Sequence, residues 1–150
     1  MRRKDREITD KKILEEILKR NKVCVVAFGG EVPYAVPMNY GYDAGTFYLH
    51  SAKAGKKIDL LKKNPNVNLV IYEDKGLVTA DTACDYGYRF SSVICTGKAE
   101  FVESASGKEE ALKKMMELIA GMKNTAFKPG EIERVHVIKV KVLEISGKRK

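Results

Sequence analysis

The pattern that most limits how this chain can fold is a series of apolar, β-branched runs separated by short turns. Residues Val23 to Phe28 read Val-Cys-Val-Val-Ala-Phe, and residues 134–145 alternate valines with polar side chains, as half-buried strands do. Gly29-Gly30 and Asp43-Ala44-Gly45 interrupt the early runs and are typical of hairpin turns. The sequence therefore predicts antiparallel strands joined by hairpins.

Six segments carry the strand pattern, and three others carry helical spacing. The predicted strands are residues 23–28, 32–42, 46–50, 66–80, 88–103 and 134–145. The predicted helices are residues 9–20, 54–63 and 104–122. Asp74-Lys75-Gly76 interrupts the fourth strand, and Gly97 suggests a bulge in the fifth. Since the chain has no βαβ alternation, repeat or linker, we expect one mainly β (α+β) domain over residues 1–150, a six-stranded antiparallel barrel with flanking helices.

Composition indicates a soluble protein of the cytoplasm. The chain has 150 residues, of which 44% are hydrophobic and 32% charged, and it lacks both a signal-peptide pattern and the apolar run of about 20 residues that spans a bilayer. Three cysteines without CxxC spacing predict neither a disulfide framework nor a metal site. Cys24 and Cys95 lie in apolar runs and are expected to be buried, whereas Cys84 lies in a loop.

A net charge of +8 raises the question of nucleic-acid binding, because clustered lysine and arginine neutralise phosphates. Part of the excess lies at the two ends of the chain, where charged residues are ordinarily solvated. No recognition-helix pattern accompanies the charge. A nucleic-acid partner is therefore not expected.

The segment His50 to Lys57, His-Ser-Ala-Lys-Ala-Gly-Lys-Lys, joins a predicted strand to a predicted helix and suggests a phosphate site. A helix N-terminus carries partial positive charge, so Lys56 and Lys57 are unfavourable there unless an anion is present. Free backbone N–H groups, the Ser51 hydroxyl and the ammonium groups would meet such an anion together. The alternative is that these lysines only solvate a helix end.

Two further strands have features of a ligand site. Pro33 and Pro37 share one face of the second strand, and proline there marks an edge or a place where a planar ring lies against the strand. Backbone groups of Met38 to Tyr40 could then meet the polar edge of that ring. In the fifth strand, Tyr88, Phe90, Ser92 and Ile94 share one face, and the two serines, Ser91 and Ser92, leave a gap among large side chains. An edge strand and an ordinary barrel strand remain the simpler interpretations.

Taken in order, these segments resemble the pyridoxamine 5'-phosphate oxidase-like flavin proteins, and most closely their nitroimidazole-resistance-like branch. The resemblance covers nearly the whole chain. It depends on Val-Pro-Met-Asn-Tyr at 36–40, Tyr-Leu-His-Ser-Ala at 48–52, Gly-Lys-Lys at 55–57, Asn-Pro-Asn-Val at 64–67, and Ser-Val-Ile with Gly-Lys-Ala at 92–99.

The resemblance implies a split β-barrel that forms a homodimer and holds flavin mononucleotide (FMN) at the subunit interface. It implies that Lys56 or Lys57 holds the phosphate with Ser51, and that His50 lies near the flavin as a catalytic candidate. The cofactor-binding residues it implies are Val36, Pro37, Met38, Asn39, Tyr40, His50, Ser51, Ala52, Lys56, Lys57 and Ser92. His136, in the last strand, is expected to be structural.

Two functions fit these expectations. One is an FMN-dependent oxidoreductase that reduces a small nitro- or quinone-like acceptor, with the cofactor carrying the electrons. The other is a module that binds or stores a flavin, or haem with His50 as a ligand, without turnover. The lysines of the 50–57 segment favour a phosphorylated cofactor.

Overall fold

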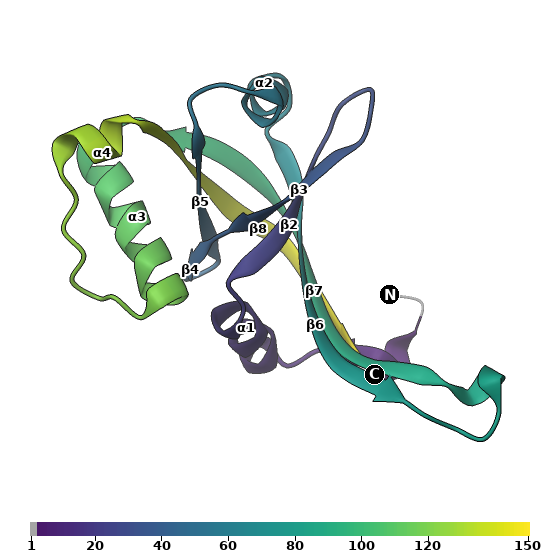
Figure 1. The fold of residues 1–150 in the computed structure, drawn as a ribbon. Coiled ribbons are helices and arrows are strands. Elements are labelled where there is room, and N and C mark those ends of the chain that lie inside the picture. Colours follow the sequence, from purple (N-terminus) through teal and green to yellow (C-terminus); the bar gives the residue numbers. More distant parts are fainter. Residues whose placement is uncertain (1–2) are drawn as a thin grey trace.

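A computed structural model describes residues 3–150, whose strands form one antiparallel sheet (Figure 1). The strands are β1 Glu7–Ile8, β2 Val23–Phe28, β3 Tyr34–Asn39, β4 Gly41–Asp43, β5 Thr46–Ala52, β6 Asn66–Val78, β7 Gly87–Val102 and β8 Val135–Arg149. The α-helices are α1 Lys11–Arg20, α2 Lys56–Lys63, α3 Ala105–Ala120 and α4 Pro129–Glu133, and single 3₁₀ turns span Lys4–Arg6 and Ala83–Asp85.

The sheet curls into a barrel that does not close. Its strand order is β3-β2-β6-β7-β8-β5-β4, with β1 added to β8. The end strands β3 and β4 are joined through Tyr40, so the two ends of the sheet meet in space, yet β3 forms no ladder with β4 or β5. This confirms the expected fold class, a split β-barrel with flanking helices.

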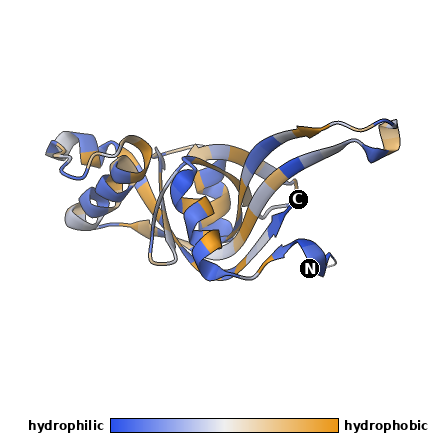
Figure 2. Cartoon of the chain, turned by 90° about the horizontal axis from the view of Figure 1, so that it is seen from below, coloured by the Kyte–Doolittle hydropathy of each residue, from blue (hydrophilic) through white to orange (hydrophobic). Residues whose placement is uncertain are grey.

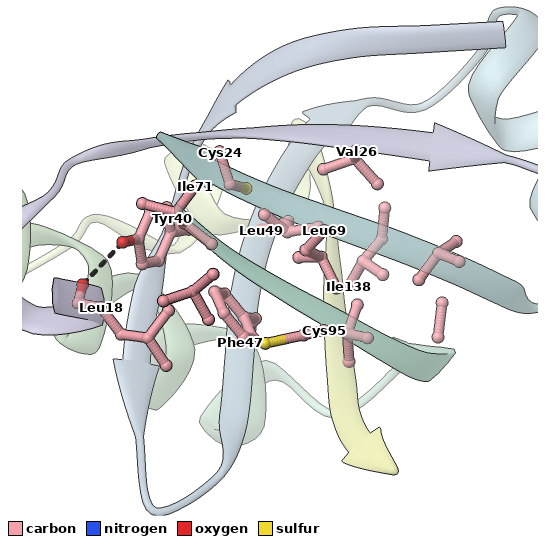
Figure 3. Packing of buried hydrophobic residues seen from close by; sticks show 14 of the residues in the cluster. Leu18, Cys24, Val26, Tyr40, Phe47, Leu49, Leu69, Ile71, Cys95 and Ile138 are labelled. Atoms are coloured by element: carbon pink, nitrogen blue, oxygen red, sulfur yellow. Dashed lines mark hydrogen bonds between the residues drawn. The ribbon is translucent and has the colours of Figure 1, made fainter. Parts of the chain in front are cut away.

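The inner faces of the strands and two helices build the main core (Figure 3). Buried side chains alternate along the strands, as Phe47 and Leu49 of β5 illustrate. The Tyr40 side chain is fully buried, and its hydroxyl donates a hydrogen bond to the Leu18 carbonyl oxygen of α1 at 2.6 Å. Helix α1 is capped by Asp10, whose side chain accepts from the Lys12 amide, in agreement with the predicted start of this helix.

The helices cover different parts of the barrel. Helix α1 adds Leu14, Ile17 and Leu18 to the core, and α2 adds Ile58 and Leu61. Helix α3 lies against β4 and β5, with further contacts to β8 and α4 (Figure 1). No helix within residues 3–150 is both long and apolar enough to span a membrane.

Several predicted boundaries are wrong. The strand expected at 32–42 is two strands, because the chain bends at Tyr40 and leaves β2 to join β5. With the two-residue β1, which the sequence pattern did not predict, the described chain has eight strands rather than six. The five-residue helix α4 was not predicted either, and the last strand runs on to Arg149 instead of ending at Ile145.

Two predicted irregularities are confirmed. The ladder between β6 and β7 shifts register between Asp74 and Leu77, and that between β7 and β8 shifts between Thr96 and Gly97. At Gly97 a Cβ atom would lie 2.6 Å from a Val140 methyl group and 2.7 Å from the Lys141 carbonyl oxygen, so a side chain does not fit. Beyond the first shift, β6 and β7 leave the barrel as a two-stranded arm (Figure 2).

Candidate functional site

The split between β3 and β5 is the place where the strands leave backbone edges unpaired. Strand β3 pairs with β2 alone, and β4 covers only residues 46–48 of β5, so residues 49–52 are paired on one side only. Figure 1 shows β3 and β5 diverging from β4, with α2 beyond their open ends. Unpaired N–H and C=O groups at a sheet edge are available to a ligand. The predicted site segments, 36–40 and 50–57, therefore flank this split.

The start of α2 has the features of an anion site. Gly55 caps the helix at φ 120°, and no side chain accepts a hydrogen bond from the first turn. Among residues 3–150, none of the ion pairs involves Lys53, Lys56 or Lys57. Free amides, a partial positive charge and ammonium groups without a counter-charge suit a phosphate.

Lys56 is positioned by a contact that the sequence pattern did not predict. Its Nζ atom lies 4.7 Å from the centroid of the Tyr34 ring, a cation–π distance, and this contact ties the start of α2 to the start of β3. Tyr34 lies on the inner face of β3 with Val36 and Met38. The alternation of β3 places Tyr34 on that face, but no local signal pairs it with a lysine 22 positions later.

Ser51 and His50 lie on opposite faces of β5. Ser51 is 5% exposed, and its hydroxyl is the one buried side-chain polar atom of the described residues that lacks a hydrogen-bond partner. An unpartnered buried hydroxyl is costly, so a ligand oxygen that bonds it would stabilise the protein. His50 and Ala52 are exposed on the outer face. The hydroxyl therefore lies inside the barrel wall, whereas the imidazole can reach only a group outside the barrel.

The His50 imidazole is held in its neutral form. Its pKa is lowered from the usual value, first by desolvation from the atoms packed around the partly exposed ring and second by the positive charge of Lys57. A histidine with a lowered pKa is uncharged at pH 7 and can accept a proton on the outer face of the split.

We expect Lys57→Met to raise the pKa of His50, because the variant removes the cationic neighbour and keeps the side-chain length. NMR titration of the His50 ring protons measures the change directly. Because the folded-state pKa lies below the unfolded value of about 6.5, the unfolded state binds the proton first as the pH falls. His50 therefore lowers stability below that pH, and Lys57→Met should reduce the loss. An unchanged midpoint would show that Lys57 points away from His50.

The predicted β3 residues divide between two faces. Val36 and Met38 pack against the core, and the Tyr40 ring is wholly inside it, so these three side chains stabilise the barrel. Pro37 and Asn39 are exposed on the outer face, where Asn39 donates a hydrogen bond to the Lys22 carbonyl oxygen at 3.0 Å. A planar ring beside β3 would meet Pro37 and the free backbone edge.

Ser92 is not brought to the split within one chain. His50 lies opposite Val137, which lies opposite Val102 of β7, ten residues along that strand from Ser92. At about 3.3 Å per residue, ten residues correspond to about 33 Å along the strand. Ser92 is half-buried on the outer face, as the alternation predicts. It can line a site at the split only as a residue of another subunit.

The three cysteines lie away from these groups or are unreactive. Cys24 and Cys95 are buried in the core, and burial raises the pKa of each thiol to about 12. Cys84 is exposed at the tip of the β6–β7 arm. All three are free thiols, in agreement with the prediction.

The open barrel defines the class of split β-barrels, and the cationic helix start at its split suits an anionic ligand. The model of the pyridoxamine 5'-phosphate oxidase family matches residues 10–149, and the chain belongs to that family. The matched range includes every residue of the predicted site. No curated protein matches the chain.

Solved structures of similar proteins agree with this assignment. A candidate 5-nitroimidazole antibiotic resistance protein of Bacteroides thetaiotaomicron is 34% identical with a TM-score of 0.84, and the match covers 95% of this chain and 86% of that one. The flavocytochrome Anf3 of Azotobacter vinelandii is 23% identical, with a TM-score of 0.86 and coverage of 100% and 72%. An FAD- and haem-binding protein of Mycobacterium smegmatis is 16% identical, with a TM-score of 0.86 and coverage of 97% and 73%. The last two show the fold alone.

Proposed function

We propose that the chain is an FMN-binding flavoprotein that reduces a small nitro- or quinone-like acceptor. The proposal depends on the start of α2. There Lys53, Lys56 and Lys57 have no ion-pair partner among the described residues, and the capping residue, Gly55, has no side chain. The flavin names of several similar structures support a flavin as the ligand. The cofactor would supply the electron transfer, and the chain would bind and orient it.

FMN suits the site better than FAD because of where its charge lies. FMN ends in a phosphate monoester that carries between one and two negative charges at pH 7, as other phosphate monoesters do. Lysines grouped at one helix start match a terminal charge. In FAD the two phosphates lie in the middle of the molecule and carry one charge each, so an adenosine would have to continue past the lysines.

We further propose that the active form is a homodimer with FMN at the subunit interface. Within one chain, Ser92 lies ten residues along β7 from Val102, the residue level with His50 across the sheet. A second copy is therefore needed to bring Ser92 to the split. The outer faces of β2, β6 and β7 expose large apolar side chains, which are Val23, Val25, Tyr72 and Ile94. An apolar surface of this kind marks a protein interface. The free thiols favour the cytoplasm as the compartment.

Within this proposal, each side chain has a defined task. Lys56, Lys57 and Ser51 would hold the phosphate, and the β3 edge with Pro37 would lie beside the isoalloxazine. His50, neutral at pH 7, would hold or hand over a proton on the outer face. Ser92 of the partner subunit would line the same space.

Purification followed by anaerobic chemistry tests the proposal. We expect the purified protein to be a dimer by light scattering, to show flavin absorbance, and to release FMN on denaturation. After reduction without oxygen, nitro and quinone compounds should reoxidise it faster than they reoxidise free FMN. A protein that neither copurifies with flavin nor binds added FMN contradicts the proposal.

The same experiment distinguishes the second candidate function, a non-catalytic flavin or haem module. Exposed His50 is available as a haem ligand, and two similar structures carry haem or cytochrome names. An intense Soret band would assign haem. Bound flavin that no acceptor reoxidises faster than free FMN would assign storage.

A further inference from the structure

A pocket lies on the outer face of the sheet where β7 pairs with β8, away from the split. We name it the serine pocket; its volume is about 320 Å³, and its lining residues are Ser92, Ile94, Ser146, Gly147 and Lys148. Ser92 lies opposite Lys148, and Ile94 lies opposite Ser146. Small and large side chains therefore alternate across the ladder, and the two serines leave the hollow.

Two aromatic rings lie next to Ser92 on the outer face of the sheet. Tyr72 of β6 lies opposite Ser92, and Phe90 precedes Ser92 by two residues on the same face of β7. Their ring centroids are 5.8 Å apart with an interplanar angle of 23°, so the rings are stacked. In the single chain Tyr72 is 54% exposed, and in the proposed homodimer its ring lies at the subunit interface together with the rest of the pocket. A stacked pair with an exposed ring face is a surface on which a further planar ring can stack.

The serine pocket also carries a cation without a counter-charge. The Lys148 Nζ atom lies 5.6 Å from the centroid of the Phe90 ring. Glu7 of β1 lies opposite Lys148, yet none of the ion pairs among residues 3–150 involves Lys148. The Glu73 carboxylate, from the residue after Tyr72, is bonded to Arg20 and Asn21 instead. An anion in the pocket would complete this arrangement.

We propose that the serine pocket binds a planar aromatic anion, such as an arenecarboxylate. Its carboxylate would contact Lys148 and the hydroxyls of Ser92 and Ser146, and its ring would lie against Phe90 and Tyr72. An apolar side chain from a second copy of the chain would fill the hollow but leave Lys148 without a counter-charge. We also propose that this anion is the electron acceptor. This second step rests on the proposed function, in which Ser92 faces the flavin of the partner subunit.

Calorimetric titration with 4-nitrobenzoate tests the proposal, with neutral 4-nitrobenzyl alcohol as the matched probe. Lys148→Met should weaken binding of the acid about ten-fold, which is the loss of one charge-assisted contact, and should change binding of the alcohol less than about two-fold. Lys141→Met, at another exposed β8 lysine, is the control and should leave both affinities unchanged. Equal affinity of Lys148→Met and the parent protein for the acid overturns the proposal.

Ser92→Leu provides the second variant, because its side chain fills the hollow. It should abolish binding of both probes, and retained binding overturns the proposal. Flavin content, measured on every sample, separates this test from that of the proposed function. A protein without flavin that binds 4-nitrobenzoate through Lys148 contradicts the function and supports the pocket. A flavin-loaded protein that binds neither probe supports the function and contradicts the pocket.

Discussion

Replacing both Lys56 and Lys57 with alanine should strip the flavin from the protein. Each lysine is expected to contribute a charge-assisted contact to the phosphate, and two such contacts at about 1.5 kcal/mol each correspond to a roughly hundred-fold rise in Kd. The ratio of flavin to protein absorbance after gel filtration, followed by fluorescence titration with FMN, measures the loss. Stoichiometric flavin in the double variant would contradict the phosphate assignment.

The same helix offers a matched control. Lys62→Ala/Lys63→Ala removes two charges from the other end of α2, where both side chains are exposed. Flavin binding should remain. At the helix start, the dipole gain of a few tenths of a kcal/mol per lysine offsets the loss of the Lys56–Tyr34 contact, so the stability without flavin should change little. At the helix end, each removed lysine should cost a few tenths of a kcal/mol, because a lysine there favours the dipole. Loss of flavin without loss of stability therefore identifies Lys56 and Lys57 as ligand residues.

Those features of the fold that depend on local periodicity could be predicted from the sequence. The alternation in β2 and β8 and the glycine at the β7 bulge needed no knowledge of distant residues. The break at Tyr40 could not be predicted in this way, because it depends on a hydrogen bond to Leu18, 22 residues away, and on the approach of α3 to Gly41. Helix α4, at five residues, is too short to show a helical period.

The sequence predicted which segments form the candidate site, but not how far apart all of the site residues lie. The 50–57 segment does lead into the start of α2, and β3 does lie across the split from β5. Strand alternation already implies that His50 and Ser51 face opposite ways, so that separation was readable from sequence. The distance of Ser92 was not, because it depends on the register of β7 with β8 and of β8 with β5.

Gly41→Ala should strongly destabilise the protein, because α3 approaches β4 closely at this residue. A Cβ atom at Gly41 would lie 2.7 Å from the Met115 amide nitrogen, 2.8 Å from the Lys114 carbonyl carbon and 2.9 Å from the Met115 Cα atom. All three are backbone atoms, so no side chain can rotate to make room. Helix α3 would have to move away from the sheet.

That movement would disturb one ion pair and a small apolar layer outside the barrel. Lys114 of α3 lies 2.8 Å from the Asp43 carboxylate of β4. The buried side chains of the layer are Ala111, Met115, Ile132 and Val137. We therefore expect Gly41→Ala to lower the free energy of unfolding by about 3 kcal/mol, near the upper end for overpacking. For a domain of this size, that corresponds to a fall in Tm of roughly 10 °C by calorimetry.

Gly130→Ala is the matched control for this variant. A Cβ atom at Gly130 meets nothing within 4 Å, and the residue lies in α4, where alanine is the better helix former. Its Tm should stay level or rise slightly. If Gly41→Ala melts with the parent protein, the α3 backbone does not rest on β4. If only Gly41→Ala loses stability, the glycine is required because it lets α3 rest on β4. That contact in turn fixes the point at which the chain leaves β3 and enters β4.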